Sequence, residues 1–181
     1  MKTTLPFVEG LSKILQKNGA ITEKMARKLS QDFKGGAKEN FDDFLLSEGL
    51  VSREDLLKAL EEYFELPAFD AKGCFFDHDL VRKFPKEVMF SKGFIPLERD
   101  GNILVVLASD PLDDDLSEII GDYVSYVPEF RVGIKQDIMD AVIEYFDTAD
   151  TVVSDDALDE FGIDDSELDS IDNYSEEDDF D

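Results

Sequence analysis

The chain has 181 residues, of which 43% are hydrophobic and 34% are charged, and its formal net charge is −26. It can form one core of ordinary size or two small cores that share an interface, but an acidic chain is a poor match for DNA or RNA. The single Cys excludes an internal disulfide and a Cys-based metal site. Without a secretory signal or an apolar run of membrane-spanning length, we expect a soluble protein that does not span a membrane.

The charge is distributed unevenly along the chain. The first 38 residues carry eight basic and three acidic residues, whereas residues 147–181 carry 16 acidic residues and no Lys or Arg. Such strong self-repulsion with few apolar residues predicts a disordered acidic linker at the C-terminal end. A segment that folds when it binds a partner is the alternative.

A helix-turn-helix pattern occurs twice, in residues 11–33 and again in residues 41–70. When the two copies are aligned on their glycines, each glycine is suited to the left-handed conformation that ends a helix, and Thr22 and Ser52 are suited to cap the next one. One hairpin alone could not bury its apolar face, so we predict a bundle of about four helices over residues 1–66. The residues that define the repeat framework are Leu11, Leu15, Gly19, Leu45, Gly49, Leu56 and Leu60.

A different pattern follows Pro67 and predicts a small α+β subdomain over residues 67–146. Two apolar runs flank a turn at residues 100–102, which favours a β-hairpin. We place a helix start at Ser109, with Pro111 at the first helical position. The order is ββαβα, with helices expected on one face of the sheet. In chain order we predict a loop at 68–79, helices near 79–84 and at 86–91, strands at 93–99 and 103–108, a helix from 109 to about 120, a strand at 126–134 and a helix at 135–146.

Motifs that would carry enzymatic chemistry are missing from the sequence. There is no GxxxxGK[ST], GxGxxG or GxSxG pattern, and the only histidine, His78, has no nucleophile in its own loop. Asp113, Asp114 and Asp115 fit the first turn of a helix better than a calcium loop. We therefore predict no catalytic residue, no metal and no cofactor in this chain.

Five basic residues lie on the first repeat and form a candidate partner-docking surface: Lys13, Lys17, Lys24, Arg27 and Lys28. Helical spacing could gather several of them on one face. The simplest interpretation is an ordinary solvated helix surface. The functional interpretations are an acidic protein partner, anionic lipid headgroups or the chain's own acidic C-terminal segment.

The arrangement resembles the N-terminal domain of type II secretion and type IV pilus assembly ATPases over residues 10–146. The resemblance rests on the two repeats, then "ELPAFD", then "FPKEVMFSKGFIPLERDGNILVVLASDPLDDDLSEII", and then a closing strand and helix. It implies a cytoplasmic protein, peripheral at the bacterial inner membrane, that is not itself an enzyme. ATP and Mg would belong to the family's motor domain, which this sequence does not contain.

Two roles are known for this domain in the family. It docks the motor onto the cytoplasmic part of an inner-membrane platform protein, or it binds cyclic di-GMP when the repeats begin Arg-Leu-Gly and end in Gln. Here the repeats begin GLS at residues 10–12 and NFD at residues 40–42, and the closing positions are Asp32 or Phe33 and Tyr63. The resemblance therefore favours docking. A cyclic di-GMP sensor and a stand-alone acidic adaptor are the alternatives.

Overall fold

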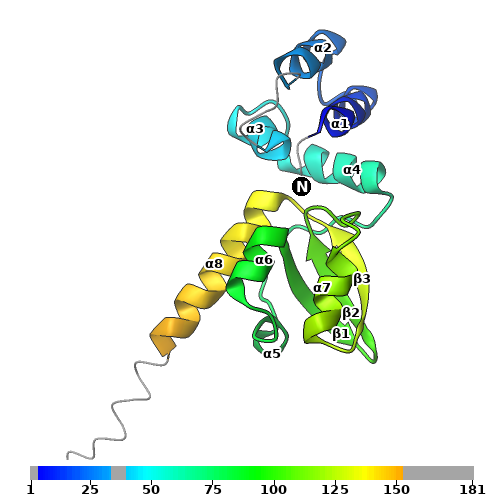
Figure 1. Ribbon diagram of the computed structural model, residues 1–181. Coiled ribbons are helices and arrows are strands. Elements are labelled where there is room, and N and C mark those ends of the chain that lie inside the picture. The colour runs from blue at the N-terminus through cyan, green and yellow to red at the C-terminus, as the bar shows by residue number, and fades with distance from the viewer. Residues whose placement is uncertain (1–3, 34–39, 153–181) are drawn as a thin grey trace, which may run out of the picture. The chain divides into compact units, whose positions relative to one another are not determined.

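Figure 1 shows the computed structural model, which describes residues 4–33 and 40–152. The chain divides into two compact units, residues 1–146 and residues 147–181. The first unit holds nearly all of the described residues. Most of the predicted acidic linker lies outside the described residues.

The two predicted hairpins are present and form a helical bundle (Figure 1). The turns contain Gly19 and Gly49, whose φ angles of 77° and 62° confirm the left-handed conformation. Thr22 and Ser52 accept hydrogen bonds from backbone N–H groups three residues further on, which confirms both N-caps. The four helices are α1 (Leu5–Lys17), α2 (Glu23–Asp32), α3 (Phe41–Ser47) and α4 (Arg53–Phe64).

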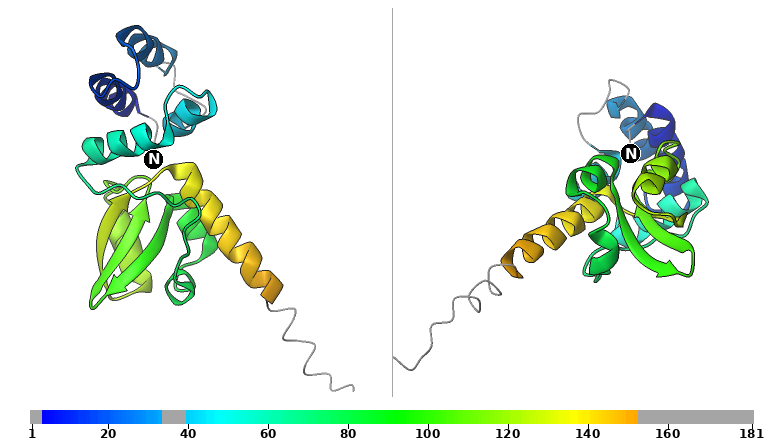
Figure 2. Two further views of the ribbon diagram at one scale, coloured as in Figure 1. Left: turned by 180° about the vertical axis from the view of Figure 1, so that it is seen from behind. Right: turned by 60° about the horizontal axis from the view of Figure 1, so that its bottom comes forward.

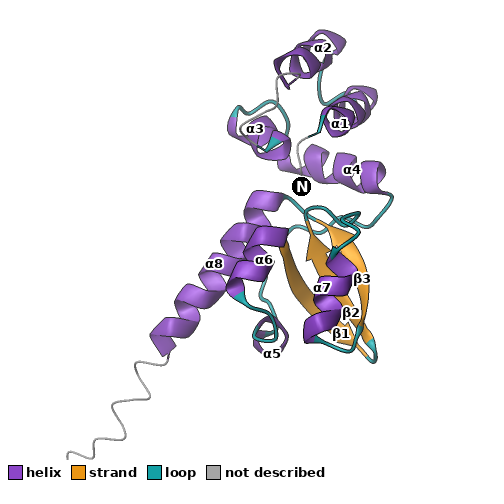
Figure 3. Cartoon of the chain, in the orientation of Figure 1, coloured by secondary structure: helices purple, strands orange, loops and turns teal. Residues whose placement is uncertain are grey.

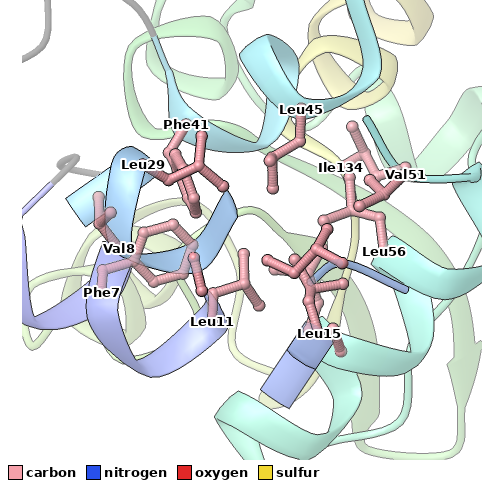
Figure 4. Packing of buried hydrophobic residues seen from close by; sticks show 14 of the residues in the cluster. Phe7, Val8, Leu11, Leu15, Leu29, Phe41, Leu45, Val51, Leu56 and Ile134 are labelled. Carbon is pink, nitrogen blue, oxygen red and sulfur yellow. The ribbon is translucent and has the colours of Figure 1, made fainter. Parts of the chain in front are cut away.

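The bundle has one hydrophobic core to which both repeats contribute, as Figure 4 shows. All five framework leucines have no exposed surface, so the prediction that the two repeats pack on each other is confirmed. Val132 and Ile134, which come much later in the sequence than the bundle, also belong to this core. The bundle therefore shares apolar contacts with the sheet that follows it. The buried framework leucines are Leu11, Leu15, Leu45, Leu56 and Leu60.

The second part of the first unit has the predicted ββαβα order, seen by element type in Figure 3. Strands β1 and β2 form an antiparallel hairpin, and β2 pairs in parallel with β3. Helix α7 connects β2 to β3. The fold class is α+β, as predicted. The elements after α4 are α5 (His78–Val81), α6 (Lys86–Lys92), β1 (Phe94–Asp100), β2 (Ile103–Ala108), α7 (Leu116–Tyr123), β3 (Val127–Val132) and α8 (Lys135–Val152).

The helix predicted to start at Ser109 begins instead at Leu116. The stretch before it is a set of turns, in which the Asp113 side chain accepts a hydrogen bond from the backbone N–H of Asp115. The same carboxylate pairs with Lys92 of α6 at 3.0 Å. Asp113, Asp114 and Asp115 therefore precede the helix and do not lie in its first turn. The ion pair with Lys92 holds Asp113 in this position.

Strand β2 is buried on both of its faces. Alternate residues of a strand point to opposite faces, yet β2 is buried from Leu104 to Ala108. On one face, Leu107 approaches Ile138 of α8 beside Gly133. On the other face, Phe94 contacts Phe84, which in turn contacts Tyr123 of α7.

Two further segments differ from the predicted pattern. Residues 67–69 are not simply a loop, because the Val132 N–H donates to the Pro67 carbonyl and the Phe69 N–H donates to the Val132 carbonyl. This places the link between bundle and sheet along the edge of β3. Helix α8 also runs six residues past the predicted end at Phe146, through a stretch without Gly or Pro that would stop it.

The bundle lies at one end of the sheet, next to the first turn of α8 (Figures 1 and 2). Among the described residues, no helix is both long enough and apolar enough to cross a membrane.

Candidate functional site: the repeat bundle and its junction with α8

The outer face of α2 gathers three of the five predicted docking residues. Lys24, Arg27 and Lys28 line one open pocket together with Glu23 and Gln31. The opposite face of α2 is directed to the bundle core, where Ala26 and Leu29 are buried. Since the apolar residues hold the helix in place, the basic side chains remain available to a partner.

The other two predicted residues lie on α1 and do not line this pocket. Lys17 pairs with Glu62 of α4 at 2.5 Å, and Asn18 donates to the same carboxylate. Lys13 is exposed one turn earlier on α1. Arg27 is also paired, with Glu23 one turn before it on α2. Such exposed pairs contribute little to stability and exchange readily with a partner's charges. Lys24 and Lys28 have no ion pair within the described ranges, and we call Lys24, Arg27 and Lys28 the α2 basic face.

The positions where the repeats begin and end are filled by side-chain packing. The Tyr63 ring covers Gly10 so closely that a Cβ atom added at Gly10 would lie 2.5 Å from Tyr63 Cε2. The same ring meets Phe7 edge to face, with centroids 5.1 Å apart. The start of the first repeat and the end of the second thus meet in an aromatic contact.

The end of the first repeat is aromatic as well. The Phe33 ring lies 5.0 Å from that of Phe41 and 5.2 Å from that of Phe44, both in T-shaped contacts. The start of the second repeat is therefore packed against the end of the first. None of these three side chains offers a hydrogen bond to a polar ligand.

Asp42, at the start of the second repeat, is fully buried. Its Oδ2 accepts a hydrogen bond of 3.2 Å from the backbone N–H of Lys135, in the first turn of α8. Nearby, the Lys135 ammonium donates to Asn40 Oδ1 at 3.3 Å. Burial raises the pKa of Asp42, although the hydrogen bond from Lys135 works in the opposite direction. The carboxylate acts as a cap for a helix that begins 93 residues later in the sequence.

Arg53, the first residue of α4, joins three segments of the chain. Its Nε donates to both oxygens of Asp70, at 3.2 and 3.1 Å, and its Nη2 pairs with Asp137 in the first turn of α8. The Asp137 side chain is 13% exposed, so this pair is shielded from solvent more than the Arg27–Glu23 pair of α2. Asp70 lies on the link between bundle and sheet and also accepts from the Lys72 N–H.

Sequence reasoning missed this junction, although two signals pointed to it. A positive charge is unfavourable in the first turn of a helix, so Arg53 next to the Ser52 cap requires an anionic partner elsewhere. Asp42 aligns with Ser12 in the repeat, and both positions are buried. A carboxylate at a buried position likewise requires a donor.

Other residues considered from the sequence form no metal-binding group within the described ranges. There, no group of three or more His, Cys, Asp or Glu side chains is placed to hold a metal ion. The His78 ring packs near that of Tyr145, with centroids 4.8 Å apart, and the Tyr145 hydroxyl donates to the His78 carbonyl.

A tandem-repeat helical bundle joined to a small ββαβα sheet defines the class of N-terminal domains found in secretion and pilus ATPases. The MshEN domain model matches residues 64–152, from the last residue of α4 through α8. The resemblance drawn from the sequence is thereby confirmed.

Individual relatives agree with this assignment. The type IV pilus assembly ATPase PilB of Myxococcus xanthus (strain DK1622) is 26% identical over 71% of this chain, which spans 23% of the length of PilB. A structure of MshE with cdg (cyclic di-GMP) has a TM-score of 0.58 at 23% identity and covers 75% of this chain and 97% of that one. The N-terminal domain of XpsE has a TM-score of 0.54 at 16% identity, with 78% and 96% covered. At these identities the two structures establish the fold alone.

Proposed function

We propose that this chain is a docking and regulatory domain of a bacterial type II secretion or type IV pilus assembly ATPase. It binds the cytoplasmic part of an inner-membrane platform protein and tethers the motor at the membrane, without catalysis of its own. The observation that carries the proposal is the α2 basic face, three exposed cations in a chain whose net charge is −26.

The charge pattern indicates what kind of partner surface would fit. An acidic patch on the platform protein would be attracted to the α2 basic face and repelled by most of the remaining surface. Complementary charge of this kind fixes orientation and accelerates association more than it tightens binding. The interaction should therefore weaken as salt screens it, with the Debye length falling from about 10 Å at 0.1 M to about 3 Å at 1 M.

A cyclic di-GMP sensor is the alternative, since MshE, a protein of similar fold, has been observed with cdg. Against it stand the residues at the repeat ends. Neither repeat begins with Arg, and Tyr63 packs on Gly10 where the first repeat begins. Each missing charge-assisted contact removes about 1.5–3 kcal/mol. Asp42, where the second repeat begins, is buried against the Lys135 N–H and offers no positive charge to a phosphate.

Reversing the α2 basic face tests the docking proposal. We compare the full chain with a variant carrying Lys24→Glu, Arg27→Glu and Lys28→Glu, in binding to the purified cytoplasmic domain of the platform protein. The matched control reverses Lys58, Arg82 and Lys83, which are also exposed.

The control changes the net charge by the same amount and also breaks one exposed i,i+4 pair, Lys58–Glu54, as the test variant breaks Arg27–Glu23. Docking through α2 predicts weaker binding of the test variant only. Equal losses in both variants would indicate a general charge effect, and unchanged binding in both would mean that α2 is an ordinary solvated surface.

A further inference from the structure

The contact between the repeat bundle and the sheet has a small apolar centre. Ile134, between β3 and α8, is 1% exposed and lies beside Val51 and Leu56 of the second repeat (Figure 4). Val132 adds a second apolar side chain to the bundle core. Two side chains from the sheet half are a modest apolar contact, so other interactions are needed to fix the orientation.

Charged contacts complete the junction on the first turn of α8. Asp42 reaches the Lys135 N–H from α3, and Arg53 reaches Asp137 from α4, so both helices of the second repeat hold the same turn. These contacts span 93 and 84 residues of sequence. A hydrogen bond or ion pair is directional, whereas an apolar contact is not, so these polar contacts fix how the two halves are oriented. When such a contact breaks, water can hydrogen-bond to the separated groups.

The link between the two halves contains a residue in a strained backbone conformation. Glu65, directly after α4, has a φ angle of 54° and is the one non-glycine residue with positive φ in the described part of the chain. An L-residue in this conformation costs about 1–2 kcal/mol, so the surrounding structure must hold it. Two residues later the chain joins the edge of β3, and Arg53 fixes the same link through Asp70.

We infer that Asp42 and Arg53 form a latch that closes the second repeat onto the first turn of α8. While the latch is closed, the bundle and α8 move as one body. When it opens, the bundle separates from Val132 and Ile134, keeps the contacts among its own four helices and pivots about residues 65–67. This inference concerns motion within the first unit and does not depend on which partner binds the α2 basic face.

Distance measurements between spin labels test the latch in the full-length chain. Labels on Gln16→Cys of α1 and Asp122→Cys of α7, both exposed, report on bundle and sheet, with Cys74→Ser removing the native thiol. We expect one narrow distance distribution in this background. Adding Asp42→Ala, which removes the acceptor of the Lys135 N–H, and Arg53→Gln should broaden it. The control Lys58→Gln removes the Lys58–Glu54 pair of the same helix and should leave the width unchanged.

Hydrogen exchange on the same variants separates an open latch from a damaged fold. An open latch predicts exchange about tenfold faster at residues 135–138, equivalent to about 1.4 kcal/mol, with the α1 and β2 amides unchanged. An unchanged distance distribution would overturn the inference. So would a uniform rise in exchange, because the contacts would then merely support the global fold. If the double variant does not fold, Arg53→Lys replaces it. Lys keeps the positive charge but cannot bind Asp70 and Asp137 at the same time as the guanidinium does, and the distance distribution and the hydrogen exchange are measured as before.

Discussion

The buried carboxylate of Asp42 accepts a hydrogen bond from the backbone N–H of Lys135 at 3.2 Å. One oxygen of this carboxylate caps α8, while the other, Oδ1, has no hydrogen-bond partner within the described ranges. A side chain from the second repeat thus stabilises the start of the last helix. The stability of α8 should therefore depend on a residue in α3.

Replacing Asp42 by Ala should destabilise the chain by about 1–2 kcal/mol, because α8 loses its cap and the partly buried N–H of Lys135 loses its acceptor. Asp42→Asn is the matched control, since its amide oxygen can accept the same bond. We expect Asp42→Asn to stay within about 0.5 kcal/mol of the parent chain at neutral pH. Urea unfolding of the three proteins measures this, and equal losses for Ala and Asn would contradict the capping role.

The raised pKa of Asp42 has a defined effect on stability. The folded protein binds the Asp42 proton more tightly than the unfolded chain does, where the pKa is near 3.8. Asp42 therefore contributes most to stability below pH 3.8, and this contribution is lost as the pH rises through the folded-state pKa. Relative to Asp42→Asn, the parent chain should become more stable as the pH falls from 7 toward 4. The difference in the free energy of unfolding between the two proteins cancels the contribution of the other carboxyl groups. A difference that does not change with pH would refute the prediction.

Gly10→Ala tests the contact between the repeat ends. The new methyl group would lie 2.5 Å from the Tyr63 ring, so the ring or the helix must move. Overpacking of this kind costs about 1–3 kcal/mol. Gly121→Ala in α7 is the control, because an added Cβ meets nothing within 4 Å there and both variants gain the same helix propensity. We expect Gly10→Ala to have the lower melting temperature, and equal values would show that Tyr63 is not held against Gly10.

The size of the native protein distinguishes a domain of an ATPase from a stand-alone adaptor. The chain spans 23% of the length of PilB, and we expect it to be the N-terminal part of a larger protein. An antibody raised against residues 1–146 should detect a band much heavier than 20.5 kDa in the source cells. A band at 20.5 kDa would instead support the adaptor.

Much of the bundle could be predicted because its determinants are local. Gly19 and Gly49 end their helices, Thr22 and Ser52 begin the next ones, and the apolar spacing marks the buried face, all within one repeat. The hairpin about residues 100–102 is equally local. Residues close together in the sequence specify these helices and this hairpin, so a local sequence pattern is enough to predict them.

The features that were missed depend on residues far apart in sequence. The late start of α7 depends on Lys92 holding Asp113, and the burial of both faces of β2 depends on where α8 returns. The junction of Asp42 and Arg53 with α8 joins positions more than 80 residues apart. Spacing alone could not pair them, although an Arg at a helix start and an acid at a buried position were signs that partners existed.

Calorimetric titration of the full chain with two ligands in parallel, the cytoplasmic domain of the platform protein and cyclic di-GMP, tests the central claim most directly. A docking domain predicts saturable, salt-sensitive binding of the platform domain. Because the repeat ends are packed with aromatic rings, cyclic di-GMP should give no saturable heat. Saturable cyclic di-GMP binding at micromolar concentration or tighter, with no binding of the platform domain, would contradict the account and identify the chain as a nucleotide sensor.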